Sequence, residues 1–88
     1  MSYALIVSPA AARDLKKLKK SISKADLLRI DEVILSLADN PRRSGAEKLT
    51  DVDAYRIRSG NFRVLFSIDD NEQAVTIEAV KDRKDAYR

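Results

Sequence analysis

The spacing of apolar residues changes once along the chain, from a helical period to a strand period, and this change constrains the fold most. Between Pro9 and Asp39 apolar side chains recur every three or four residues, as on one face of a helix. From residue 54 onward apolar and polar side chains alternate over the ranges 54–58, 61–68 and 74–80, as in strands. A short apolar segment, residues 2–7, comes before the helices and is typical of another strand. The order β-α-α-β-β-β predicts an α+β domain, with a helical hairpin packed on one face of a mostly antiparallel sheet.

Capping signals set the limits of the two helices. Ser8 followed by Pro9 is typical of a helix start, with the serine as the cap and proline at the first helical position. Ser23 with Asp26 three residues later resembles a capping box, and Asn40 before a proline is a stop signal. We therefore expect helices over residues 9–20 and 23–39, followed by a polar connecting loop over residues 41–53.

Composition limits the chemistry that the chain can perform. Its 88 residues suffice for one domain, which we expect to span residues 1–88. The sequence contains no Cys and no His, which excludes disulfides, thiolate nucleophiles, His-based proton transfer and the usual zinc sites. No apolar run approaches the roughly 18 residues of a membrane-spanning helix, and the start does not resemble a signal peptide. We expect a cytoplasmic protein without a membrane partner.

The turns between the last three strands predict their register. If Ser59 and Gly60 form a two-residue hairpin loop, Arg56 lies directly opposite Arg63. A second turn at Asn71 and Glu72 would bring Phe66 opposite Ile77 and Val64 opposite Ala79. Both registers place the apolar side chains on one face, which we assign to the core: Tyr55, Ile57, Phe62, Val64, Phe66 and Ile68.

The opposite face of the predicted sheet carries three arginines: Arg56, Arg58 and Arg63. Like charges directly opposite each other destabilise a sheet, so such a cluster needs an explanation. The arginines could be solvated, or could pair with Glu78 on the same face. We favour an anion-binding face, because planar guanidinium groups bind phosphate through two hydrogen bonds. The net charge of +3 agrees with a nucleic-acid partner without demonstrating one.

The end of the chain adds four cations and an aromatic side chain: Lys81, Arg83, Lys84, Arg88 and Tyr87. Such an end is often a frayed polar tail. It follows a strand next to the arginine-bearing one, however, and could fold over the basic face. An aromatic ring stacked on a base, with cations on the backbone, is a common way to hold single-stranded RNA.

Two segments resemble a known family. The run YRIRSGNFRVLF from Tyr55 to Phe66, together with RKDAYR at residues 83–88, is similar to the RelE/ParE toxin superfamily, and the ending favours its RelE branch. The resemblance extends over most of the chain, to ARDLKKL at residues 12–18, EKL at residues 47–49 and Asn40 with Pro41. It implies a ribosome-dependent endoribonuclease of a toxin–antitoxin pair, which cuts mRNA in the ribosomal A site.

The resemblance also implies roles for single residues. Arg56 and Arg58 correspond to two basic residues of the family's catalytic strand, and Arg63 to the arginine of the next strand. Arg83 corresponds to the arginine after the last strand, and Tyr87 to the terminal tyrosine. Some members carry Lys at the positions of Arg56 and Arg58, and many carry His where this chain has Asp82. Arginine is a poor general base, so the base is Arg58 in a special environment, Tyr87 or a group of the ribosome.

The implied reaction is a metal-free transesterification that needs no cofactor. The 2′-OH of the RNA attacks the adjacent phosphorus, and the products are a 2′,3′-cyclic phosphate and a 5′-OH. We expect further RNA contacts from four lysine and arginine side chains: Lys48, Lys81, Lys84 and Arg88. A RelB-like antitoxin is the expected partner in a hetero-oligomer, and we expect it to dock near Leu15 and Leu18.

Three other functions are compatible with the sequence, one of which is a degenerate family member that only binds its partner. A metal-dependent nuclease could use the carboxylates of Asp51, Asp53, Asp69 and Asp70, but the last two lie in a predicted turn, where Asp is common for structural reasons. A ParE-like toxin would inhibit DNA gyrase by binding it. Because the same fold serves both kinds of toxin, the fold does not distinguish them.

Overall fold

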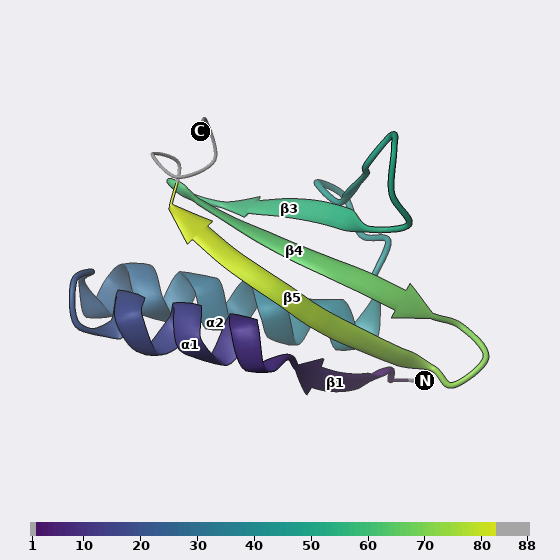
Figure 1. Cartoon of the computed structure of the whole chain (residues 1–88), viewed down its shortest axis with the longest axis horizontal. Coiled ribbons are helices and arrows are strands. Elements are labelled where there is room, and N and C mark those ends of the chain that lie inside the picture. Colours follow the sequence, from purple (N-terminus) through teal and green to yellow (C-terminus); the bar gives the residue numbers. More distant parts are fainter. Residues whose placement is uncertain (1, 83–88) are drawn as a thin grey trace.

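A five-stranded sheet with two helices on one of its faces forms the molecule, in a computed structural model that describes residues 2–82 (Figure 1). The spatial order of the strands is β1-β5-β4-β3-β2. Strand β1 is parallel to β5, and all other pairs are antiparallel. The elements are β1 (Ala4–Val7), α1 (Pro9–Lys19), α2 (Lys24–Asp39), β2 (Glu47–Lys48), β3 (Tyr55–Ser59), β4 (Phe62–Asp69) and β5 (Ala74–Asp82). The predicted α+β class and element order are confirmed, with β2 as an addition.

Strand β2 lies inside the segment predicted to be a loop. It has two residues, Glu47 and Lys48, which pair with Arg56 and Tyr55 at the edge of the sheet. Two residues are too few to produce an alternating pattern, so periodicity could not reveal this strand.

Both helices begin as the capping signals predicted. The Ser8 side chain accepts a hydrogen bond from the backbone N–H of Ala11 at 3.1 Å. The Ser23 side chain accepts one from the N–H of Asp26, also at 3.1 Å. These bonds satisfy N–H groups that have no partner within the helix. In the part of the chain that the structure describes, neither helix is long and apolar enough to cross a membrane.

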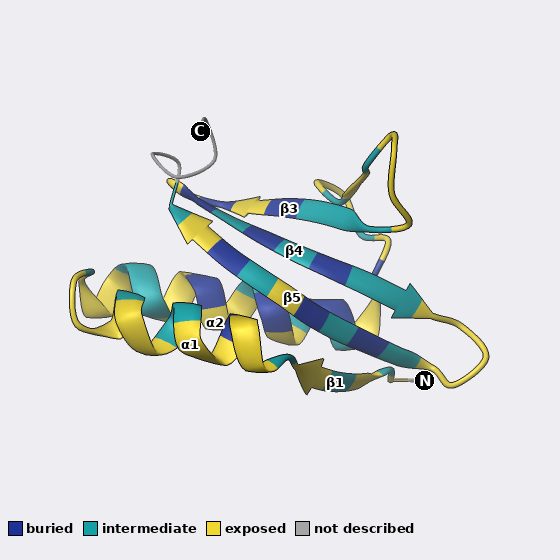
Figure 2. Ribbon diagram, viewed as in Figure 1, coloured by how far each residue is buried: buried dark blue, intermediate teal, exposed yellow. Residues whose placement is uncertain are grey.

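The core lies between the helices and the face of the sheet that they cover (Figure 2). Phe66, Val64, Val75 and Ile77 of the sheet are fully buried there, as is Ile30 of α2. Ala11 of α1 and Leu37 of α2 complete the contact between the layers. Neither α1 nor α2 lies over the other face, which we call the outer face (Figure 1).

The hairpin between β3 and β4 has a different register from the predicted one. Its loop consists of Gly60 and Asn61, and Ser59 pairs with Phe62. Gly60 has φ +60°, which favours glycine at the first position of a two-residue loop. Arg58 therefore lies opposite Arg63, and the predicted pairing of Arg56 with Arg63 is wrong. The error is a slip of two positions, so every side chain keeps its predicted face.

The hairpin between β4 and β5 contains an irregularity that the sequence did not indicate. Phe66 pairs with Ile77 as predicted, but Val64 pairs with Val80 rather than Ala79. The register shifts at Leu65 and Phe66, where β5 contains one extra residue, Glu78. Such a bulge increases the local twist and changes which side chains of β5 face the arginines.

Helix α1 replaces a neighbouring strand along the second half of β5. Strand β1 pairs with β5 only as far as Ile77. Beyond that point the Ser8 hydroxyl donates to the carbonyl of Glu78 at 3.2 Å. The Asp14 carboxylate then accepts the backbone N–H of Val80 at 3.0 Å and forms an ion pair with Lys81 at 3.2 Å. The side chains of Ser8 and Asp14 therefore cover this edge of β5. In Figure 1, α1 lies beside this part of the strand.

Candidate nucleic-acid interface

Three cations form a row across the outer face at the end where β5 finishes. Arg58 pairs with Arg63 in the sheet, and Arg63 pairs with Lys81, so the three side chains share one face. Neighbouring strands are about 4.8 Å apart, which places the three backbone positions within about 10 Å. We call Arg58, Arg63 and Lys81 the cationic row. Their proximity produces a positive potential that suits a polyanion.

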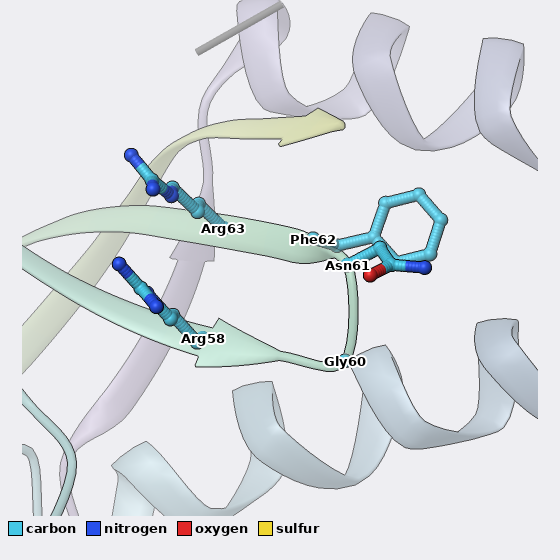
Figure 3. A pocket seen from close by; sticks show the side chains of 5 residues that line it. All are labelled: Arg58, Gly60, Asn61, Phe62 and Arg63. Atoms are coloured by element: carbon cyan, nitrogen blue, oxygen red, sulfur yellow. The ribbon is translucent and has the colours of Figure 1, made fainter. Parts of the chain in front are cut away.

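A shallow pocket lies at one end of the cationic row, beside the β3–β4 loop. Five residues line it: Arg58, Gly60, Asn61, Phe62 and Arg63. In Figure 3 the side chains of Arg58 and Arg63 lie side by side and point in the same direction, while Phe62 turns to the other side of the strand. Phe62 belongs to the core, so the hairpin is anchored on one face and presents its arginines on the other. Two parallel guanidinium groups can bind the oxygens of one phosphate.

Arg56 occupies the same outer face but has an acidic partner. Its guanidinium forms an ion pair with Glu47 of β2 at 3.1 Å, and 28% of its side chain is exposed. In the sheet it lies opposite Leu65. Arg56 and Arg58 are two positions apart on β3, so their backbone positions are about 7 Å apart. Glu47 therefore orients Arg56 beside the cationic row.

Glu78, considered above as a partner for the arginines, accepts a hydrogen bond from the Ser67 hydroxyl at 3.1 Å. Within residues 2–82, Arg58 forms no ion pair with a carboxylate. The pairing with Glu78 is therefore not observed: Arg56 pairs with Glu47 instead, and Arg58 has no carboxylate partner among the described residues.

The remaining predicted RNA contacts have different positions. Lys81 is in the cationic row and contacts Asp14. Lys48 pairs with Tyr55, whose ring stacks on the buried Phe66, so Lys48 belongs to the face that the helices cover and not to that of the arginines. Four predicted site residues lie outside the described residues: Arg83, Lys84, Tyr87 and Arg88.

The two leucines predicted to contact an antitoxin are partly buried and pack against the core. Leu15 lines a hollow between the helices with Leu27 and Asp31. Leu18 lines another hollow, between α1 and the end of β5, with Lys17 and Lys81. Each leucine therefore combines a structural contact with some accessible apolar surface.

A second polar cluster, at the opposite end of the sheet, was not predicted. The Arg42 guanidinium binds the Asp70 carboxylate through two hydrogen bonds, of 3.1 and 2.9 Å. The Tyr3 hydroxyl also donates to Asp70, at 2.8 Å, and Arg42 lies over the ring of Tyr55. Hydrogen bonds from Arg42 and Tyr3 lower the pKa of Asp70, and the bond to Asp70 raises the pKa of Tyr3. These residues are up to 67 positions apart in sequence, and no local pattern connects them.

The four aspartates considered as metal ligands can now be placed in part. Asp70 is bound by Arg42, and Asp69 accepts the backbone N–H of Glu72 at 3.1 Å within the turn. The Asp69 side chain therefore performs the turn chemistry favoured above, whereas the Asp70 side chain belongs to the cluster with Arg42 and Tyr3. Asp51 and Asp53 are exposed in the segment before β3.

Comparison with known proteins identifies the family. Residues 5–87 match the family described as ParE toxin of type II toxin-antitoxin system, parDE. Toxin RelE of Mycobacterium tuberculosis is 32% identical over 87 residues, which cover 98% of this chain and 87% of that protein.

Solved structures agree with this result. The toxin–antitoxin complex RelBE2 of Mycobacterium tuberculosis contains a chain with a TM-score of 0.80 and 27% identity, with 94% of this chain and 100% of that chain covered. The archaeal RelE–RelB complex of Pyrococcus horikoshii contains a chain with a TM-score of 0.73 and 26% identity, with 94% of this chain and 97% of that chain covered. The chain belongs to the RelE/ParE family, the toxins of type II toxin–antitoxin systems.

Proposed function

We propose that this toxin is a ribosome-dependent endoribonuclease that cleaves mRNA in the A site and so stops translation. The cationic row carries this proposal. It places Arg58 directly opposite Arg63 on the face of the sheet that neither α1 nor α2 covers, and two guanidinium groups side by side suit the oxygens of a phosphate. The similarity to Toxin RelE supports the same proposed function.

In the proposed mechanism the 2′-OH of the mRNA loses its proton and attacks the neighbouring phosphorus. The bond from phosphorus to the 5′ oxygen breaks, and that oxygen gains a proton. Negative charge grows on the phosphoryl oxygens during this step, and preorganised cations there can contribute several kcal/mol, roughly 10²- to 10³-fold in rate for each donor. Arg58 and Arg63 are the pair whose positions fit these oxygens best.

Three other residues would complete the site. Arg56, oriented by Glu47, would bind the same or the adjacent phosphate. Arg83 would stabilise or protonate the leaving oxygen, and Tyr87 would stack on a base. The general base is one of Arg58, Tyr87 and a ribosomal group. Cation-assisted transesterification of this kind uses no metal and no cofactor.

We also propose a RelB-like antitoxin as the partner that neutralises the toxin in a cytoplasmic hetero-oligomer. Two structural relatives were solved as complexes of a RelE toxin with RelB or as a RelBE assembly. The accessible parts of Leu15 and Leu18 offer apolar contacts on either side of α1 for a helix or extended segment.

A ParE-like inhibitor of DNA gyrase is the second candidate, because the matching family carries the ParE description. Two assays separate the candidates. Purified toxin is added to an in vitro translation reaction, and primer extension then maps breaks in the mRNA. In parallel, the same toxin is added to a gyrase supercoiling reaction.

The nuclease proposal expects cleavage within A-site codons, dependent on ribosomes, and normal supercoiling. Arg63→Ala should reduce cleavage by about 10²- to 10³-fold. Arg29→Ala, which changes an exposed arginine of α2 paired only with Asp26, should not affect it. Loss of supercoiling without mRNA cleavage would favour the gyrase inhibitor.

A further inference from the structure

The last part of β5, from Val80 to Asp82, is held differently from the rest of the strand. Strand β1 accompanies β5 only as far as Ile77, and the bulge at Glu78 follows directly. From Val80 onward β4 is the neighbouring strand on one side, and a side chain of α1 contacts the other side. This short segment contains Lys81 of the cationic row. The direction in which β5 ends therefore depends on α1 as well as on the sheet.

A single carboxylate of α1 makes this connection. Asp14 Oδ2 accepts the backbone N–H of Val80 at 3.0 Å, and Asp14 Oδ1 accepts a hydrogen bond from Nζ of Lys81 at 3.2 Å. The Asp14 side chain is 19% exposed, whereas that of Lys81 is 46% exposed. We call these two contacts the Asp14 anchor. Because one oxygen binds the backbone and the other binds the ammonium group, the anchor fixes both the course of the strand and the position of the Lys81 charge.

The Asp14 anchor lies where two parts of the proposed RNA site meet in the sequence. Lys81 pairs with Arg63 in the sheet and so belongs to the cationic row. Arg83, proposed above to act on the leaving oxygen, follows Lys81 by two positions and lies outside the described residues. Consecutive Cα atoms are 3.8 Å apart, so the Cα atoms of Lys81 and Arg83 are within about 8 Å of each other. A change in the direction of β5 at Val80 would therefore displace both residues relative to Arg63.

We propose that Asp14 is a positioning residue of the RNA site, which holds the end of β5 so that Lys81 and the segment after Asp82 meet the same phosphate as Arg63. The inference rests on the proposed function. It extends that function to a residue of α1 that touches neither RNA nor the reacting atoms.

The negative charge of Asp14 distinguishes this role from a simple electrostatic one. A carboxylate beside a cationic site repels phosphate, so charge alone predicts that its removal strengthens RNA binding and speeds cleavage. A neutral acceptor could satisfy the N–H of Val80 without this repulsion. The positioning role predicts the opposite sign, because loss of the Asp14 anchor misaligns the groups that act on the phosphate.

The test compares wild type, Asp14→Ala, Asp14→Asn and Ser8→Ala in the ribosome-dependent cleavage assay, at a temperature where circular dichroism shows all four proteins to be folded. Ser8→Ala is the matched control for lost stability, because it removes the helix cap and a hydrogen bond from the same helix to β5 but leaves the carboxylate in place. A displacement of about 1 Å can reduce a rate about 10²-fold, so Asp14→Ala should lower kcat by about 10- to 10²-fold without raising KM. Asp14→Asn keeps an acceptor for the N–H of Val80 and should recover part of the rate, and Ser8→Ala should cleave like wild type.

Amide hydrogen exchange measures the Asp14 anchor without cleavage. Lost stability accelerates exchange at every amide that opens by global unfolding, and Val75, in the part of β5 between β1 and β4, reports that change. Asp14→Ala should accelerate exchange at Val80 more than at Val75, because it removes the acceptor of the Val80 N–H. Ser8→Ala should accelerate exchange at Val80 no more than at Val75.

Three results would overturn the proposal. One is a kcat of folded Asp14→Ala equal to or above that of wild type, and another is an equal loss of kcat in Ser8→Ala. The third is an Asp14→Ala variant whose exchange increases equally at Val80 and Val75. Failure of the nuclease proposal would appear separately, as intact mRNA with wild-type toxin, and the exchange measurement would still decide whether Asp14 holds the end of β5.

Discussion

Replacing Asp14 by alanine should destabilise the fold more than any other change at an acidic side chain of the helices. The Asp14 carboxylate accepts the backbone N–H of Val80, a residue that is 2% exposed, and water cannot easily replace it. A hydrogen bond to a charged group contributes about 1.5–3 kcal/mol, and the exposed ion pair with Lys81 adds at most about 1 kcal/mol. We therefore expect Asp14→Ala to lower the free energy of unfolding by about 2–3 kcal/mol.

For a domain of this size each kcal/mol corresponds to about 4–8 °C in melting temperature, so the expected decrease is about 10–20 °C. Urea and thermal unfolding followed by circular dichroism measure both quantities. Asp14→Asn keeps an acceptor for the N–H of Val80, so it should lower the free energy of unfolding by only about 1 kcal/mol. Asp31→Ala, at an exposed acid of α2, serves as the control and should change stability by less than about 0.5 kcal/mol. If Asp14→Ala is as stable as Asp31→Ala, the helix does not protect the edge of β5 as described.

Three further predictions concern the site and the distant polar cluster. Arg63→Ala should keep the native circular dichroism spectrum but reduce mRNA cleavage by about 10²- to 10³-fold, because it removes a preorganised donor to the phosphate; a large loss of structure would instead show a structural role. Tyr87→Ala should reduce cleavage by about 5- to 150-fold through lost stacking, and Tyr87→Phe should retain activity unless the hydroxyl takes part in proton transfer. The hydrogen bonds from Arg42 and Tyr3 lower the pKa of Asp70 in the folded state. Their stabilisation of the fold is therefore fully present above the pKa of Asp70 in the unfolded chain, about 4, and it is lost as the pH falls through the lower pKa of the folded state. The melting temperatures of wild type and Asp70→Asn should accordingly differ at pH 6 and approach each other as the pH is lowered below about 4, and a constant difference would contradict this cause.

Features encoded by neighbouring residues could be predicted from the sequence. Ser8 and Ser23 cap the helices as expected, because a cap depends on residues within one turn. The face of the sheet on which each strand residue lies was also predicted correctly, because a slip of two positions in the β3–β4 hairpin preserves the alternation of side chains. The slip nevertheless changed the partner of Arg63 from Arg56 to Arg58.

Features that depend on distant residues could not be predicted. The bulge at Glu78 arises where β4, β5 and α1 meet, and no local signal marks it. Asp14 looks like an ordinary charge on an amphipathic helix until β5 is placed beside it, 66 positions later. Lys48 is expected in the RNA site, but its pairing with Tyr55 places it on the other face, and no pattern around residue 48 indicates this pairing.

We propose that the cationic row makes this toxin a ribosome-dependent ribonuclease. The most direct measurement is primer extension on a defined mRNA carried by ribosomes with an empty A site, incubated with purified wild-type toxin or with Arg58→Ala, Arg63→Ala or Arg29→Ala. We predict cleavage inside the A-site codon by wild type and Arg29→Ala, no cleavage without ribosomes, and a loss of at least about 10²-fold for Arg58→Ala and Arg63→Ala. Intact mRNA with folded wild-type toxin, or equal cleavage by all four proteins, would contradict the account.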